Sequence, residues 1–121
     1  MRIFIWTLAA WLSALPALAQ DAAKGPEDVE KAIQFLLDAV AKSDATFIRN
    51  GEPHDGKEAA GHMAAKRQYF RNQIRTPEDF IRWAGTRSEL SGKAYEVKLR
   101  DGRSMPTGRW LALLLNDYRR R

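Results

Sequence analysis

The sequence contains no cysteine. This absence excludes disulfide bonds, thiolate zinc sites, a cysteine nucleophile, covalently attached c-type haem and a lipid-modified N-terminal cysteine. Long apolar runs are also missing, because the longest one, residues 3–15, falls short of the ~20 residues that a membrane-spanning helix needs. The 121 residues amount to the length of one domain, which excludes a large multidomain enzyme and a polytopic membrane protein.

The first 19 residues have the pattern of a secretory signal peptide. Arg2 is their only charge, an apolar run follows, and Pro16 ends it before the small-x-small sequence Ala17-Leu18-Ala19. This pattern predicts cleavage after Ala19 and export to the periplasm, with an uncleaved anchor helix as the alternative. We expect residues 20–25 to form a flexible leader, residues 26–121 to form a single α+β domain, and no transmembrane segment to remain after cleavage.

Apolar residues that recur at helical spacing predict four helices in the remaining chain. They span about residues 26–42, 55–74, 77–84 and 107–118. Asp55 is expected to cap the second helix and to form a capping box with Glu58. Thr76 and Thr107 are expected to cap the third and fourth helices.

Two hairpins are predicted between these helices. The β-prone residues 46–49 lead into Asn50-Gly51, a strong hairpin turn signal, and residues 52–54 return as a short edge strand. Residues 94–100 alternate apolar and polar side chains, and Asp101-Gly102 then turns the chain into a short arm at residues 103–105. The order α-β-β-α-α-β-(β)-α predicts an α+β fold, a small antiparallel sheet with about four packed helices.

Four short motifs resemble those of a known family. They are residues 47–51 (FIRNG), residues 58–63 (EAAGHM) followed by Lys66, residues 76–81 (TPEDFI), and the spaced group Ser88, Ser91, Gly92 and Tyr95. Together they resemble the YfeK-like family of small exported bacterial proteins (domain of unknown function 5329), over roughly residues 29–115. The resemblance implies a small periplasmic protein and identifies no catalytic residues.

The second predicted helix carries the one arrangement that suggests acid–base chemistry. Glu58, His62 and Lys66 follow one another at i, i+4 and i+8 and share one flank of that helix. His62 would be a general base oriented by Glu58, with Ser88 or Ser91 as a nucleophile or hydrogen-bond donor. In the alternative interpretation, Glu58 belongs to the helix cap and His62 is a structural residue that hydrogen-bonds the hairpin or the serine-rich loop.

A second hypothesis gathers basic and hydroxyl side chains into an anion-binding pocket. It requires the first hairpin and the loop at residues 86–93 to fold over the second helix, where guanidinium, ammonium and hydroxyl donors suit a carboxylate or phosphate. The candidate residues are Arg49, Asn50, His62, Lys66, Arg87, Ser88 and Ser91.

Metal, cofactor and nucleic-acid functions are not expected. His54, Asp55, Glu58 and His62 lie close in the sequence, but Asp55 is occupied as a cap and the spacing is not that of a zinc motif. Lys and Arg outnumber Asp and Glu by 20 to 15, yet the two signs alternate, and residues 119–121 form the only basic block. The sequence favours a periplasmic binding or envelope accessory domain, whose partner is an anionic envelope ligand or a periplasmic protein. A small periplasmic hydrolase that uses His62 is the alternative.

Overall fold

The computed structural model describes residues 26–121. The predicted signal peptide, residues 1–19, and the predicted leader, residues 20–25, lie outside the described residues. The described helices and strands are α3 (Val29–Lys42), β1 (Thr46–Arg49), β2 (Glu52–His54), α4 (Gly56–Tyr69), α5 (Pro77–Ala84), β3 (Glu96–Lys98), β4 (Ser104–Pro106) and α6 (Thr107–Arg119). Their order confirms the predicted α+β class, including the short fourth strand.

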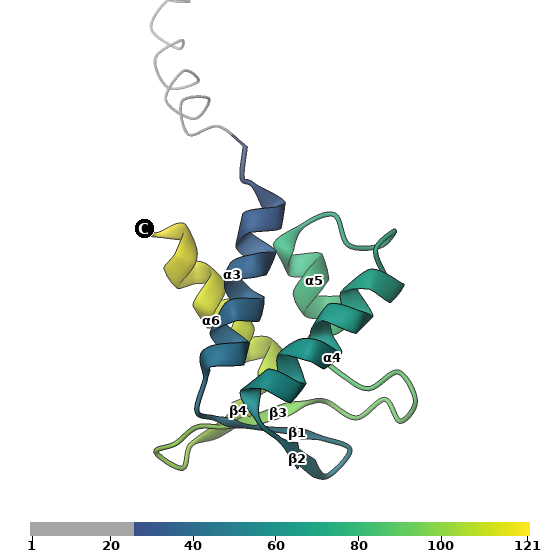
Figure 1. Cartoon of the computed structure of the whole chain (residues 1–121), viewed down its shortest axis with the longest axis vertical. Coiled ribbons are helices and arrows are strands. Elements are labelled where there is room, and N and C mark those ends of the chain that lie inside the picture. Colours follow the sequence, from purple (N-terminus) through teal and green to yellow (C-terminus); the bar gives the residue numbers. More distant parts are fainter. Residues whose placement is uncertain (1–25) are drawn as a thin grey trace, which may run out of the picture.

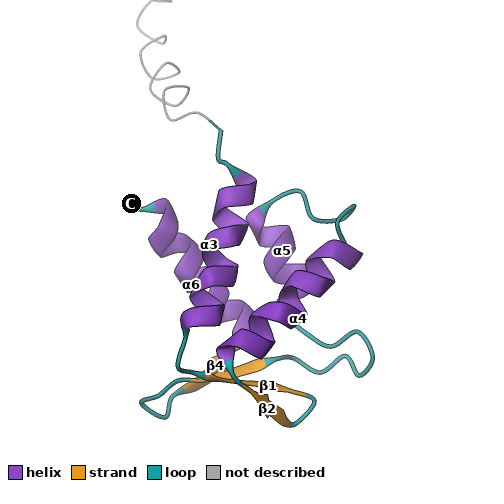
Figure 2. Cartoon of the chain, viewed as in Figure 1, coloured by secondary structure: helices purple, strands orange, loops and turns teal. Residues whose placement is uncertain are grey.

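The strands form one antiparallel sheet in the order β2-β1-β3-β4. Strand β1 pairs with β2 through Phe47 and His54, and with β3 through Phe47 and Val97. Helices α4 and α5 lie between β1 and β3 in the sequence, so the two central strands come from distant parts of the chain. The helices gather on one face of the sheet, as Figures 1 and 2 show, which gives the domain two layers.

The core fills the space between these two layers. Strand residues that point toward the helices are buried, and Val97 is completely inaccessible to solvent. The apolar stripe of α3 and the side chain of Phe80 in α5 are also buried. The fully buried large side chains are Phe80, Ile33, Leu36, Leu111, Val40, Val97, Thr107 and Pro77. The core therefore contains side chains from both the helical layer and the sheet.

Two helix ends differ from the prediction. Helix α3 begins at Val29 rather than near Pro26, because the side chain of Asp28 accepts a hydrogen bond from the backbone of Lys31 and caps the helix there. Helix α4 ends at Tyr69 rather than near Ile74, and the chain turns before Ile74 packs against the core. Apolar spacing alone did not distinguish a helical Ile74 from one that reaches the same core from a turn.

The predicted cap at Thr107 is wrong. Pro106 occupies the capping position of α6, and Thr107 is the first residue inside the helix. The Thr107 backbone N–H donates to the Tyr95 carbonyl at 2.9 Å, while the Thr107 hydroxyl has no hydrogen-bond partner in the described protein. Thr107 therefore joins α6 to the strand side of the fold through its backbone.

The other two predicted caps are present. Asp55 and Glu58 form the predicted capping box at the start of α4. Thr76 caps α5 and forms a capping box with Asp79. Among the described residues, no helix has the length and the apolar composition needed to cross a membrane.

Candidate functional site

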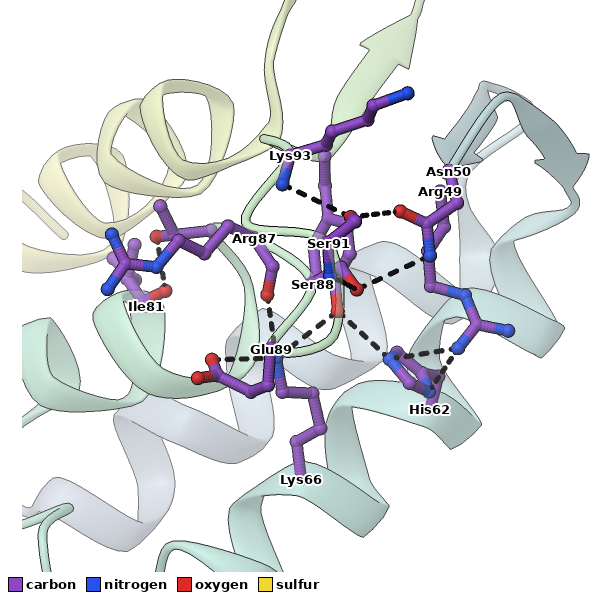
Figure 3. A network of polar contacts seen from close by, with 12 residues as sticks. Arg49, Asn50, His62, Lys66, Ile81, Arg87, Ser88, Glu89, Ser91 and Lys93 are labelled. Carbon is purple, nitrogen blue, oxygen red and sulfur yellow. Dashed lines mark hydrogen bonds and ion pairs between the residues drawn. The ribbon is translucent and has the colours of Figure 1, made fainter.

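Three segments of the chain converge beside α4. They are the β1–β2 turn with Arg49 and Asn50, the flank of α4 with His62 and Lys66, and the loop between α5 and β3. Figure 3 shows their side chains linked by a continuous set of polar contacts. The structure thus brings together most of the residues of the anion-binding hypothesis.

Tyr95 lies at the centre of this polar network. Its hydroxyl oxygen is 3.2 Å from the Lys66 ammonium and 3.1 Å from His62 Nε2. Since an ammonium only donates, Tyr95 accepts from Lys66 and its own proton is available to His62 Nε2. The sequence alone did not mark Tyr95 as a site residue, because the alternation of residues 94–100 placed it on the apolar face of a strand. Its alignment with His62 depends on how β3 pairs and packs, which the sequence did not specify.

Lys66 is a buried cation held by three oxygen atoms. Only 9% of the residue is exposed. Its ammonium donates to the Arg87 carbonyl at 2.8 Å and to Tyr95, and it lies 3.5 Å from a Glu89 carboxylate oxygen. The Arg87 partner is a backbone carbonyl and Tyr95 is buried, while Glu89 is exposed. Lys66 therefore anchors the α5–β3 loop and keeps one contact at the surface.

His62 lies between two cations. Burial lowers the pKa of His62 below its usual value, and the charges of Arg49 and Lys66 lower it further. The Arg49 Nη1 atom is 3.2 Å from His62 Nδ1 and 3.3 Å from Nε2. The imidazole is therefore neutral at pH 7, since protonation would add a third positive charge to this cluster.

Asn50 and two serines fasten the hairpin turn to the α5–β3 loop. Asn50 Nδ2 donates to the Ser88 hydroxyl at 3.3 Å, and the Ser91 hydroxyl donates to Asn50 Oδ1. The Ser91 backbone N–H also donates to the Ser88 hydroxyl. We call these three residues the Asn50 clasp. Among the described contacts neither serine touches His62, so this geometry does not favour a serine nucleophile.

Arg87 and Glu58 do not take the places that were predicted for them. Arg87 contributes its backbone carbonyl to Lys66, and Figure 3 shows its side chain pointing away from Arg49 and His62. Glu58 bonds the Asp55 backbone in the capping box and lies 3.8 Å from His54 Nδ1. No hydrogen bond or ion pair joins Glu58 to His62 in residues 26–121, so the predicted ladder along α4 is not formed.

The metal alternative requires four side chains of the same segment to converge. His54, Asp55, Glu58 and His62 do not converge, because the Asp55 and Glu58 carboxylates each bond a backbone N–H of the other residue. Within the part of the chain that the structure describes, no group of three or more histidine, aspartate and glutamate side chains is placed to hold a metal ion.

An open groove of about 470 Å³ runs over the polar network. Arg49, His62, Lys66 and Tyr95 line it, and Glu89 also reaches it. Its border is apolar, because Tyr69 is 79% exposed and Leu90 is 99% exposed. The groove combines a cationic lining with exposed apolar side chains, an arrangement suited to a ligand that is partly anionic and partly apolar.

These features define a small α+β domain with a positively charged groove beside one helix of its helical layer. The chain belongs to the Family of unknown function (DUF5329), whose profile matches residues 27–119. It is 38% identical over 96 residues to the "Uncharacterized protein YfeK" of Salmonella typhimurium, a match that covers 78% of this chain and 77% of the relative. No solved structure matches the chain significantly. The comparisons confirm the resemblance that the sequence motifs indicated.

Proposed function

We propose that this protein is a periplasmic binding domain whose groove takes the anionic group of an envelope ligand. One observation carries the proposal. Arg49 is a half-buried guanidinium that lines the groove and has no carboxylate partner within residues 26–121. A guanidinium offers five N–H donors in a planar fork, which suits a carboxylate or a phosphate.

Lys66 supplies a second positive charge and an exchangeable contact. Its bonds to Tyr95 and to the Arg87 carbonyl hold the ammonium in place. Its third partner is the Glu89 carboxylate, which is itself an anion at the edge of the groove. An incoming carboxylate or phosphate would displace Glu89 and bind between Lys66 and Arg49. Glu89 therefore competes with the ligand.

The apolar border narrows the ligand class further. Exposed Tyr69 and Leu90 flank the groove, and burying such side chains is favourable at about 25 cal/mol per Å². The ligand would therefore carry an apolar or flat part beside its anionic group. A fatty acid, an acylated phosphate or an acidic peptide with an aromatic residue has this chemistry.

Ligand binding is tested by thermal unfolding at low salt. A ligand at 100 times its Kd stabilises the folded state by about 2.7 kcal/mol, which is a readily measured rise in Tm. We expect octanoate and octyl phosphate to raise Tm more than acetate and inorganic phosphate do. Arg49→Gln should abolish the shift, and Glu89→Gln should enlarge it.

Arg100→Gln is the matched control. It removes the same charge from an exposed residue that pairs with Asp44 and does not line the groove. An equal loss of the shift in Arg100→Gln and Arg49→Gln would show that only net charge matters and would refute the groove. The absence of any shift with all four probes would refute anion binding.

Export is part of this proposal and has its own test. The apolar run at residues 3–15 and the Ala17-Leu18-Ala19 sequence carry this part of the proposal. We expect the full chain, expressed in a bacterium, to appear in the periplasmic fraction with Gln20 as its first residue. Mass spectrometry of the purified protein checks both points, and a cytoplasmic protein that keeps residues 1–19 would contradict export.

A further inference from the structure

His62 lies in the wall of the groove, beside the two cations that would bind the ligand. Its ring faces the Arg49 guanidinium, with Nδ1 3.2 Å and Nε2 3.3 Å from Arg49 Nη1, as Figure 3 shows. The Tyr95 hydroxyl lies 3.1 Å from His62 Nε2 and 3.2 Å from the Lys66 ammonium. The imidazole therefore contacts one cation directly and is separated from the second by a single hydroxyl group.

The contact with Arg49 favours the neutral form of His62. A guanidinium can only donate hydrogen bonds, so the ring nitrogen that accepts from it carries no proton. Protonation would place an N–H on both ring nitrogens and turn this hydrogen bond into a repulsive contact between two donors. Burial lowers the pKa of His62, and the charges of Arg49 and Lys66 lower it in the same direction. An anion that accepts the Arg49 hydrogen bonds removes this obstacle to protonation.

We infer that an anion binds in the groove together with a proton on His62, so that the groove holds its ligand more tightly in a mildly acidic medium than in a neutral one. In the bound state Arg49 donates to the ligand oxygen atoms instead of the imidazole. The freed ring nitrogen takes a proton from the solvent, and a ring N–H then donates to the same anion. This inference rests on the proposed function and adds the regulation of that site by pH.

The protein's own carboxylates around His62 are paired with other groups. The titratable and charged groups that face this region are Arg49 of β1, His54 of β2, Glu58, Lys66 and Tyr69 of α4, Glu89 of the α5–β3 loop, and Tyr95 of β3. Glu58 bonds the Asp55 backbone, and Glu89 lies 3.5 Å from the Lys66 ammonium. Neither carboxylate forms a hydrogen bond or an ion pair with His62 in the part of the chain that the structure describes. A bound ligand would therefore be the first anionic partner of His62.

The size of the effect follows from the reciprocity of linked binding. If an anion favours protonation of His62 by a given factor, the proton strengthens anion binding by the same factor, and couplings of this kind are commonly at least about fivefold. The ligand offsets the charges of Arg49 and Lys66, so it raises the pKa of His62 toward or above the ordinary histidine value of about 6.5. The added affinity therefore appears as pH falls through this range and is lost as pH rises above it.

Isothermal titration calorimetry with octyl sulfate tests the inference, because this probe keeps one negative charge from about pH 5 to about pH 8, where histidine titrates. We expect the Kd for octyl sulfate to be about five times lower at the acidic end of this range than at the alkaline end. Titrations in two buffers of different ionisation enthalpy should show proton uptake on binding. An equal Kd at both ends, or no proton uptake, would overturn the inference and leave the groove in place. No binding at any pH would overturn the proposed function as well.

Two variants and an NMR titration assign the proton to His62. His62→Gln keeps a neutral hydrogen-bonding side chain and should bind octyl sulfate with the same Kd at both ends of the range. His54→Gln removes the other histidine, which does not line the groove, and should keep the difference. If His62→Gln does not fold, an NMR titration of the wild-type His62 ring replaces it, because octyl sulfate must raise the pKa of His62. A difference that survives in His62→Gln or disappears in His54→Gln, or a His62 pKa that octyl sulfate does not raise, would overturn the inference.

Discussion

The Asn50 clasp allows a prediction whose magnitude follows from its contacts. Asn50→Gly removes two side-chain hydrogen bonds across the interface between the turn and the loop. Each such bond contributes about 0.5–1.5 kcal/mol net, so we expect the free energy of unfolding to fall by about 1–3 kcal/mol. Glycine tolerates the positive φ of 52° at this position, so this variant leaves the backbone unstrained.

Asn50→Ala separates the backbone contribution from that of the side chain. Alanine loses the same two bonds and must also adopt the left-handed conformation, which costs a further 1 kcal/mol or so. We therefore expect Asn50→Ala to be about 1 kcal/mol less stable than Asn50→Gly. Urea unfolding followed by circular dichroism measures both values, and equal stability of the two variants would contradict the backbone argument.

A double-mutant cycle tests whether the clasp is one unit. Ser91→Ala removes the partner of Asn50 Oδ1, so the loss in Asn50→Gly plus Ser91→Ala should be smaller than the sum of the single losses. Contacting residues in one network show coupling of at least about 0.5 kcal/mol. Additive losses, or an Asn50→Gly protein as stable as the wild type, would refute the reasoning that the clasp stabilises this region.

Two further predictions concern a helix start and an ion pair. Gly56→Ala should destabilise the fold by about 1–3 kcal/mol in the same urea assay, because a Cβ there would lie 2.2 Å from the Val40 carbonyl oxygen. Gly61→Ala is the control and should be neutral or stabilising, because a Cβ at Gly61 would have nothing within 4 Å. Equal effects would contradict the close approach of α4 to the end of α3. Hydrogen bonds from Arg119 lower the pKa of Glu27 and of Glu78, so their stabilisation is present above the ordinary glutamate pKa of about 4.3 and is lost as pH falls through the lowered values. The difference in unfolding free energy between wild type and Arg119→Gln should therefore be at most about 1 kcal/mol per ion pair near pH 6. It should shrink below pH 4, and a difference that stays constant with pH would contradict the ion pairs.

Local signals in the sequence were sufficient for most of the fold. Asn50 and Gly51 both have positive φ, as their hairpin turn requires, and the alternation of residues 95–99 places Tyr95, Val97 and Leu99 on the core side. These features depend on neighbours within a few residues, so the sequence could predict them. The end of α4 depends instead on tertiary packing, because Ile74 reaches the core from a turn.

The site was predictable in its residue types but not in its partners. The helical spacing placed His62 and Lys66 on one flank of α4, and both line the groove. The pairing of β3 with β1, which no local pattern encodes, brings Tyr95 between them. Ser88 and Lys66 are also buried, and their partners depend on how the α5–β3 loop folds back onto α4. Composition indicated an anion site but did not reveal that its hydroxyl groups are already bonded within the protein.

The bonds among these polar side chains make the proposed site preorganised. Asn50, Ser88 and Ser91 bond to one another, so they contribute rigidity rather than donors for a ligand. The clasp holds the turn that carries Arg49, and His62 contacts its guanidinium, so the cation is oriented before any ligand arrives. A preorganised group loses less side-chain entropy on binding, which increases affinity without an additional contact. If the clasp serves this purpose, Asn50→Gly should weaken octanoate binding although the Asn50 side chain is already bonded to the two serines.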